Sequence, residues 1–185
     1  MKNIFKGEIL VLTPKRHIDN RGFFAETWRQ QNFLDLNLEL NFVQDNHSVS
    51  LKTGTLRGLH FQSPPHAQAK LVRCGKGMVF DVVVDIRKGS PSYGMWNGYH
   101  LSSQNGRQLY IPKGFAHGFL TLEPESEIIY KCSDYYVPET EKSLRWNDPD
   151  LRIQWPTYDE VLISEKDAKA PLLSEIDSPF YWEVG

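Results

Sequence analysis

The stretch MVFDVVVDIR, residues Met78–Arg87, decides the fold class. Its apolar residues recur at every second position, which is the side-chain period of a β-strand and not that of a helix. One face of this strand is wholly apolar and is formed by Met78, Phe80, Val82, Val84 and Ile86. The opposite face carries Asp81 and Asp85 among valines. The stretch therefore predicts a strand with one face turned toward a hydrophobic core.

Eight further segments have strand-like composition and are separated by turns rich in glycine, proline and serine. They cover residues 8–12, 42–50, 55–62, 69–74, 98–101, 108–111, 118–122 and 127–136. Helical periodicity is weak, and we expect only short helices, at residues 28–36 and 164–170. Strands at this spacing indicate an all-β sandwich or barrel. We expect the tail after Pro138 to pack around it as irregular structure.

The size of the chain predicts one domain over residues 1–185, because 185 residues with 40% hydrophobic content can form one sizeable core. The net charge of −2 provides no overall field to attract DNA or RNA, so no nucleic-acid partner is expected. No apolar run approaches the roughly 20 residues of a membrane span, so no membrane partner is expected. Cys74 and Cys132 form no CxxC pair and indicate free thiols in a cytoplasmic protein.

Polar residues inside strand-like segments mark a candidate site, because an apolar core would otherwise occupy these positions. In RGLHFQ, His60 and Gln62 share one strand face, and in QDNHS the same holds for Gln44, Asn46 and Ser48. A histidine in a strand is more often structural than catalytic, and an amide row is more often a solvent-exposed face. From the residues alone, both interpretations stay open.

Two further segments supply single candidates. GRQLYIPKGFAH, residues 106–117, uses glycine and proline to fix a turn before a strand, so His117 is delivered at a defined position. EIIYKCSDYY, residues 127–136, places Tyr130 on a strand face, where packing is a commoner role than proton donation. Arginine and lysine side chains elsewhere would form a phosphate site only if they converge.

The segment 106–117 matches the second sequence motif of the cupin fold. The first motif, which supplies paired histidines in metal-binding cupins, reads His60-Phe61-Gln62 here, so one ligand is replaced and no bound metal is expected. Over nearly the whole chain, seven ordered motifs resemble the dTDP-4-dehydrorhamnose 3,5-epimerase family: DNRGFF, QDNHS, RGLHFQ, DVVVDIRKGSPSYG, IPKGFAHGF, YKCSDYY and WNDPDLRIQWP. The resemblance implies an all-β cupin-type jelly roll (a double-stranded β-helix) with a few short peripheral helices. It also implies a homodimer without cofactors that acts on dTDP-4-dehydro-6-deoxy-D-glucose, in the pathway to dTDP-L-rhamnose.

The resemblance further implies a set of catalytic residues. Inversion at a carbon beside a ketone needs a base that removes the proton, a cation that holds the enolate, and an acid on the opposite face. His60 matches the family's base, and Asp167 matches the carboxylate that orients it. Lys70 matches the cation. Tyr130 matches the acid, because a phenol with an unperturbed pKa of about 10 stays protonated at neutral pH.

Substrate contacts are implied at a second group of positions. They are Arg21, Glu26, Gln44, Asn46, Arg57, His117, Glu141 and Lys166. The arginines and Lys166 suit the diphosphate, and Tyr136 matches an aromatic residue that stacks on the thymine ring. Arg57 and His60 are three residues apart, so a regular strand would send them to opposite faces. If both reach one pocket, as the resemblance implies, we expect a bulge or an edge at Gly58.

Three hypotheses remain beside double inversion at C3 and C5. Related enzymes of antibiotic-sugar pathways invert only one centre, C3 or C5, of a dTDP-4-keto sugar. A metal cupin, such as a dioxygenase or a metal-dependent isomerase, is motivated by His60 and His117, and stoichiometric bound metal would support it. A nucleotide-sugar-binding module without turnover would bind the ligand but would exchange no substrate protons.

Overall fold

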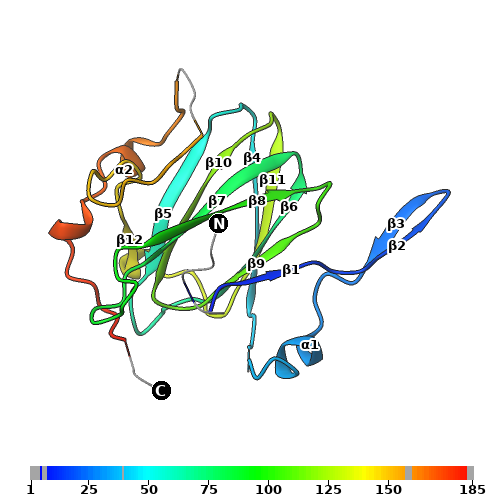
Figure 1. Cartoon of the computed structure of the whole chain (residues 1–185), viewed down its shortest axis with the longest axis horizontal. Helices are drawn as coiled ribbons and strands as arrows, with labels where there is room; N and C mark the ends of the chain where they lie inside the picture. The colour runs from blue at the N-terminus through cyan, green and yellow to red at the C-terminus, as the bar shows by residue number, and fades with distance from the viewer. Residues whose placement is uncertain (1–4, 6–7, 39, 157–159, 183–185) are drawn as a thin grey trace.

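Two antiparallel five-stranded sheets lie face to face in the computed structural model, which describes residues 5, 8–38, 40–156 and 160–182 (Figure 1). The first sheet has the order β1-β9-β6-β11-β4, with the bounds Leu10–Leu12, Gln108–Ile111, Lys70–Lys76, Ser126–Cys132 and Gln44–Ser50. The second has the order β12-β5-β10-β7-β8, with the bounds Glu141–Ser143, Leu56–Gln62, Phe115–Thr121, Met78–Asp85 and Trp96–Ser102. The predicted all-β sandwich is confirmed.

Helices are few and short, as predicted. Helix α1 spans Gln30–Leu34 and helix α2 spans Glu165–Ala168, within the two segments expected to be helical. Single 3₁₀ turns occur at Pro138–Thr140 and Leu173–Glu175. In the part of the chain that the structure describes, no helix has the length and apolar character needed to cross a membrane.

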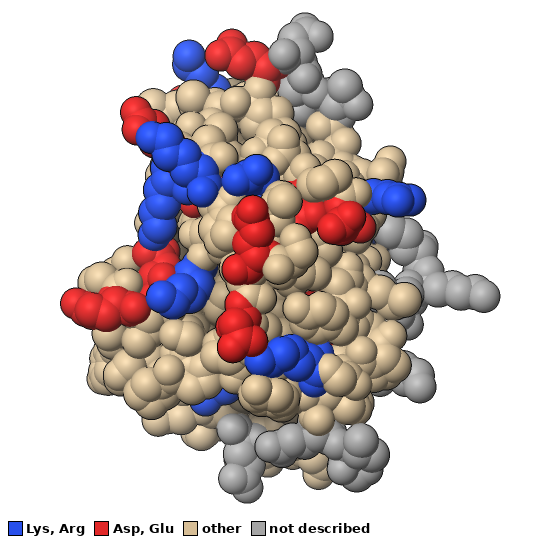
Figure 2. All heavy atoms as spheres, turned by 90° about the vertical axis from the view of Figure 1, so that its left-hand side faces the viewer, with Lys and Arg blue, Asp and Glu red and all other residues tan. Residues whose placement is uncertain are grey.

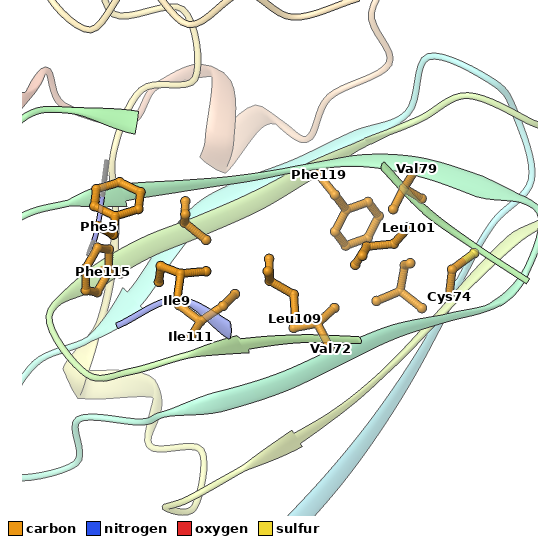
Figure 3. Packing of buried hydrophobic residues seen from close by; sticks show 12 residues of the cluster. Phe5, Ile9, Val72, Cys74, Val79, Leu101, Leu109, Ile111, Phe115 and Phe119 are labelled. Atoms are coloured by element: carbon orange, nitrogen blue, oxygen red, sulfur yellow. The ribbon is translucent and has the colours of Figure 1, made fainter. Parts of the chain in front are cut away.

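The core between the sheets is built from the side chains that both sheets turn inward. Figure 3 shows Phe119, Val79 and Leu101 of the second sheet facing Val72 and Leu109 of the first. These residues are at most 5% exposed, and burial of each such side chain contributes about 1.5–3 kcal/mol. This inner core fills the space between the two sheets from Phe115 to Val79 (Figure 3).

Strand β7 has a core on both faces, which corrects the prediction of a single core face. Val79 and Val83 belong to the inner core, although Asp81 and Asp85 share their face. The wholly apolar face instead packs beneath the segment that follows β12, in a second cluster that includes Leu144 and Leu151. Strand β7 is buried on both faces because this segment covers the outer face of the second sheet. The prediction that the tail packs around the β core is thereby confirmed.

The ends of several strands differ from the predicted ones. Residues 133–136 were predicted to continue the strand now seen as β11, but β11 ends at Cys132. Beyond it the chain turns across the sheet edge, where the Ser133 amide donates to the Ala69 carbonyl and the Tyr136 amide to the Gln44 side chain. Strand β10 begins three residues earlier than predicted, at Phe115. The short strand β12 was not predicted.

A two-stranded hairpin projects from the body of the molecule, and we call it the arm (Figure 1). It consists of β2, Arg16–Asp19, and β3, Gly22–Ala25. The arm was not predicted, because its apolar side chains are exposed and give no buried periodicity: Ile18 is 79% and Phe24 71% exposed. Such an exposed apolar surface is typical of an interaction site.

Candidate active site

One cavity of about 570 Å³, lined by residues of both sheets, collects most of the predicted site residues. Of the thirteen predicted residues, eight line it: Arg57, His60, Lys70, His117, Tyr130, Glu141, Lys166 and Asp167. They come from both sheets and from α2. A volume in this range is typical of small-molecule sites.

His60 enters the cavity from β5 and is held by a carboxylate of α2. Its Nε2 lies 2.6 Å from Asp167 Oδ1, and Asp167 Oδ2 accepts a hydrogen bond of 3.2 Å from the Gly58 amide. Ser164 caps α2 by accepting from the Asp167 amide at 3.1 Å. Burial acts to raise the pKa of Asp167, but the hydrogen bonds from His60 and Gly58 hold that pKa below its ordinary value. Asp167 is therefore an ionised partner that fixes the imidazole of His60.

The predicted bulge at Gly58 is confirmed. His60 lies opposite His117 of β10, whereas Arg57 lies opposite Phe119, so β5 uses one residue more than β10 between these pairs. The bulge turns both Arg57 and His60 into the cavity. Gly58 has φ of +117°, and a Cβ atom here would approach the Cα of Gly118 at 2.6 Å. The residue must be glycine for β5 to come this close to β10.

We predict that Gly58→Ala lowers the free energy of unfolding by about 2–5 kcal/mol, because left-handed strain and a backbone clash add together. Gly89→Ala is the matched control: its φ is +81°, but a Cβ there meets nothing within 4 Å. The control should lose only about 1–2 kcal/mol. Chemical denaturation of both variants measures the difference, and equal losses would contradict the role given to the close approach.

Lys70 and Tyr130 reach the same cavity from the opposite sheet. Lys70 begins β6 and Tyr130 lies in β11, and the Lys70 ammonium is 5.8 Å from the centre of the Tyr130 ring. Burial lowers the pKa of Lys70, against the opposing effect of Cys132, Glu141 and Asp81. Burial also raises the pKa of Tyr130, so its phenol keeps its proton at neutral pH. The amine of Lys70 and the protonated phenol of Tyr130 thus face His60 across the cavity.

His117 is the second imidazole of the cavity and has its own carboxylate. Its Nε2 lies 3.0 and 2.9 Å from the two carboxylate oxygens of Asp81 in β7. Asp81 is 0% exposed, and it was not among the predicted site residues. Asp81 was not predicted as a site residue because it shares a strand face with both valines and Asp85, and that face was predicted to be less buried than the opposite one.

Three further charged residues, Arg57, Glu141 and Lys166, also line the cavity. Arg57 donates from Nε to Ser50 Oγ and from Nη2 to the Val49 carbonyl, each at 3.1 Å. Lys166 of α2 forms an ion pair with Glu141 of β12. Figure 2 shows that basic and acidic side chains are intermixed over the face that carries α2 and β12. The Lys166 charge is therefore balanced by Glu141 when no ligand is bound.

Three more predicted residues lie at the edge of the cavity without lining it. Gln44 donates to Asn46 Oδ1 at 3.0 Å and accepts from the Tyr136 amide at 2.9 Å. The Tyr136 hydroxyl donates to Glu141 at 2.8 Å, which raises the pKa of that phenol. These contacts connect the amide row to Glu141.

Arg21 and Glu26 are not brought to the cavity by this chain. Arg21 lies in the turn of the arm and pairs with Asp19 at 2.6 Å. Glu26 follows the arm and pairs with Arg29, also at 2.6 Å. Both are held by local partners on the far side of the molecule from α2 (Figure 1).

Sequence reasoning missed the segment that closes the cavity near α2. Leu162, Ile163 and Ser164 line the cavity, and a parallel bridge joins Leu162 to Thr55. Irregular backbone has no periodicity, so only Ser164, as a residue type favoured at a helix N-cap, carried a signal. Among the described residues, no group of three or more His, Cys, Asp or Glu side chains is placed to hold a metal ion. The expected absence of a cofactor stays a prediction.

Comparison with known proteins first defines the class: cupin-type β-sandwich epimerases that act on carbohydrates. The chain is 53% identical to the dTDP-4-dehydrorhamnose 3,5-epimerase of Salmonella typhimurium over 91% of this chain and 92% of that protein. The dTDP-6-deoxy-D-glucose-3,5-epimerase of Legionella pneumophila, solved with dTDP-4-keto-L-rhamnose, is 48% identical, covers 95% of each chain and superposes with a TM-score of 0.91. A 3'-monoepimerase of Streptomyces bikiniensis, solved with dTDP-quinovose, is 36% identical over 90% of this chain and 84% of that one, with a TM-score of 0.86.

The family model described as dTDP-4-dehydrorhamnose 3,5-epimerase matches residues 6–175. The chain belongs to the dTDP-4-dehydrorhamnose 3,5-epimerase family. The predicted family and the predicted cupin-type fold are thereby confirmed.

Proposed function

We propose that the protein inverts C3 and C5 of dTDP-4-dehydro-6-deoxy-D-glucose and forms dTDP-4-dehydro-L-rhamnose. The observation that carries this proposal is a cavity with His60 on one sheet and Tyr130 and Lys70 on the other. Removal of a proton from one face of the sugar and its return to the other require such opposed groups. Membership of the family supports the same reaction.

The reaction proceeds through an enolate at each centre. His60 takes the proton on the carbon beside the ketone, the electron pair of that C–H bond forms a double bond to C4, and the π pair of the ketone moves to the C4 oxygen. Lys70 holds the negative charge there, at a position where burial keeps water from screening it. Tyr130 then gives its proton to the opposite face of the carbon. Exchange with solvent reprotonates Tyr130 and deprotonates His60, which restores both groups for the second centre.

The nucleotide end of the substrate binds along the charged border of the cavity. Arg57 and Lys166 suit the two phosphates, because a guanidinium offers a planar fork and an ammonium a point charge. The diphosphate would replace Glu141 as the partner of Lys166. Gln44, Asn46 and Tyr136 lie beyond this border, where an amide row and an aromatic ring fit a pyrimidine base.

We also propose that two chains associate and that the arm of each completes the site of its partner. Arg21 and Glu26 match family contacts, yet within one chain they lie on the far side from α2. The exposed Ile18 and Phe24 of the arm would be covered in the homodimer. The free thiols of Cys74 and Cys132 support a cytoplasmic location for this assembly.

The association predicts a specific effect of Phe24→Asp. Wild-type protein is expected to sediment at about twice the chain mass of 21.4 kDa, and the variant as single chains with a kcat/KM lower by on the order of 10²-fold. Leu51→Asp, which changes a side chain 73% exposed outside the arm, is the control and should stay dimeric. A fully active wild-type monomer would contradict the proposed exchange of arms.

The one-centre reaction is the second candidate, and similarity to the 3'-monoepimerase of Streptomyces bikiniensis favours it over a metal enzyme or a binding module. The test is incubation with dTDP-4-dehydro-6-deoxyglucose in deuterated water with a chelator, followed by NMR. Deuterium at positions 3 and 5 supports double inversion, and deuterium at position 3 alone supports the narrower reaction. Ligand binding without label at either position would overturn the proposal in favour of a binding module, and activity that needs added metal would favour a metal enzyme.

A further inference from the structure

Two histidine–carboxylate pairs lie side by side in the cavity. His60 of β5 and His117 of β10 are direct cross-strand partners. Each ring places its Nε2 against a carboxylate, that of Asp167 for His60 and that of Asp81 for His117. The first pair is the proposed catalytic base, and the second has the same construction.

Asp81 lies in a setting where a carboxylate is costly. It is 0% exposed, and its strand neighbours on the same face, Val79 and Val83, belong to the apolar inner core. Tyr99 lies opposite it on β8. Burial raises the pKa of Asp81, and the charges of His117 and Lys70 act against this rise. A buried carboxylate without partners would be strongly destabilising, so its presence here depends on these groups.

The contacts also identify which nitrogen of His117 meets a ligand. Nε2 of His117 lies almost equally far from the two oxygens of Asp81, at 3.0 and 2.9 Å, as one N–H shared between both oxygens of a carboxylate would, so we assign the proton to Nε2. Nδ1 has no partner among the described residues, and it is not one of the fully buried unpartnered atoms. Because His117 lines the cavity, Nδ1 is the ring nitrogen that remains to meet a ligand there.

We propose that Asp81 is a positioning residue for the epimerisation, which fixes His117 as the neutral Nε2–H tautomer so that Nδ1 accepts a hydrogen bond from a sugar hydroxyl. This inference rests on the proposed function, because it places the sugar ring beside both histidines. The contact orients the ring so that the carbon beside the ketone meets His60. Asp81 acts through His117 and does not touch the substrate itself.

The tautomer is tested directly, without turnover, on wild-type protein labelled with ¹⁵N-histidine. The His117 signals, assigned by their loss in His117→Gln, are expected to show a protonated Nε2 and an unprotonated Nδ1. In Asp81→Asn the amide can donate to Nε2, so the proton should move to Nδ1. A wild-type signal with Nδ1 protonated, alone or together with Nε2, would overturn the proposal.

The kinetic test compares Asp81→Asn with Asp85→Asn. Asp85 is a buried carboxylate of the same strand and face, but its partners are Arg87, Ser90 and Ser92, outside the cavity. Asp81→Asn is expected to lower kcat on the order of 10²-fold with KM changed less than about threefold, whereas Asp85→Asn should lower thermal stability and keep kcat within about twofold. Equal kcat values in the two variants would contradict the inference.

A double variant separates a role through His117 from an independent one. If Asp81 acts only through His117, then Asp81→Asn combined with His117→Gln should have the kcat of His117→Gln alone. Multiplied losses would overturn the proposal. The ¹⁵N measurement needs no catalysis, so its result tests the role of Asp81 independently of the proposed reaction. Loss of epimerase activity in the wild type would instead count against the proposed function.

Discussion

His60→Ala is expected to stop deuterium exchange at both C3 and C5, with a loss of at least about 10²–10⁴-fold, while the affinity for dTDP stays within about twofold. The imidazole is the group that breaks the C–H bond, and without it no enolate forms. The nucleotide contacts proposed for Arg57 and Lys166 are separate from His60. Exchange is followed by NMR in deuterated water, and dTDP affinity by calorimetry.

Two further variants make this result specific. His60→Asn keeps a polar partner beside Asp167 and should lose exchange equally, so a folding defect of the alanine variant cannot explain the loss. His47→Ala removes a histidine that pairs with Glu127 at 3.3 Å outside the cavity, and it should retain full exchange. Wild-type exchange in either His60 variant would remove this residue from the role of base.

Tyr130→Phe should separate proton removal from inversion. The phenylalanine ring keeps the packing beside Lys70 but lacks the hydroxyl that delivers the second proton. His60 can still remove a proton and return a deuteron to the same face. We therefore expect substrate that gains deuterium without inverting, while the rate of product formation falls by about 10²–10⁴-fold. NMR measures label and configuration in the same sample.

Tyr110→Phe is the control for this prediction. Tyr110 is a buried tyrosine of β9 that packs in a separate cluster with Phe33 and Leu71, away from the cavity. Its loss of a hydroxyl should leave both exchange and inversion unchanged. Full inversion by Tyr130→Phe, or the loss of exchange together with inversion, would contradict the assignment of Tyr130 as the acid of the opposite face.

Most strands of the two sheets were predictable from local sequence pattern, although β12 was not. Strand β9 was predicted with its observed bounds. The bulge at Gly58 was predicted from the spacing of Arg57 and His60 together with the family resemblance, which implied that both reach one pocket. The arm escaped prediction because Phe24 and its neighbours are exposed, so no alternation between buried and polar residues marks it. Alternation along a sequence indicates which residues of a strand are buried, and the apolar side chains of the arm are not buried within one chain.

The residues that line the cavity were predictable where the family resemblance placed them, on strands for His60 and Tyr130 and on α2 for Asp167. His60, Lys70, His117 and Tyr130 all lie on strands and line one cavity. Asp81 escaped because its strand has a core on both sides, a fact that depends on the distant segment after Ser143. Contacts between such distant segments are set by tertiary packing, which strand periodicity does not encode.

The segment after Ser143, which covers the outer face of the second sheet, is synthesised after the strands of both sheets. Every strand of both sheets precedes residue 144, whereas the carboxylate that orients His60 comes from Asp167. On a ribosome, the hydrogen-bonded ladders can close before the partner of the base has been synthesised. A nascent or truncated chain ending at Ser143 would thus leave the apolar face of β7 exposed to solvent. It would also leave His60 without its hydrogen-bond partner Asp167. The same segment therefore covers the outer face of the second sheet and supplies the carboxylate that orients His60.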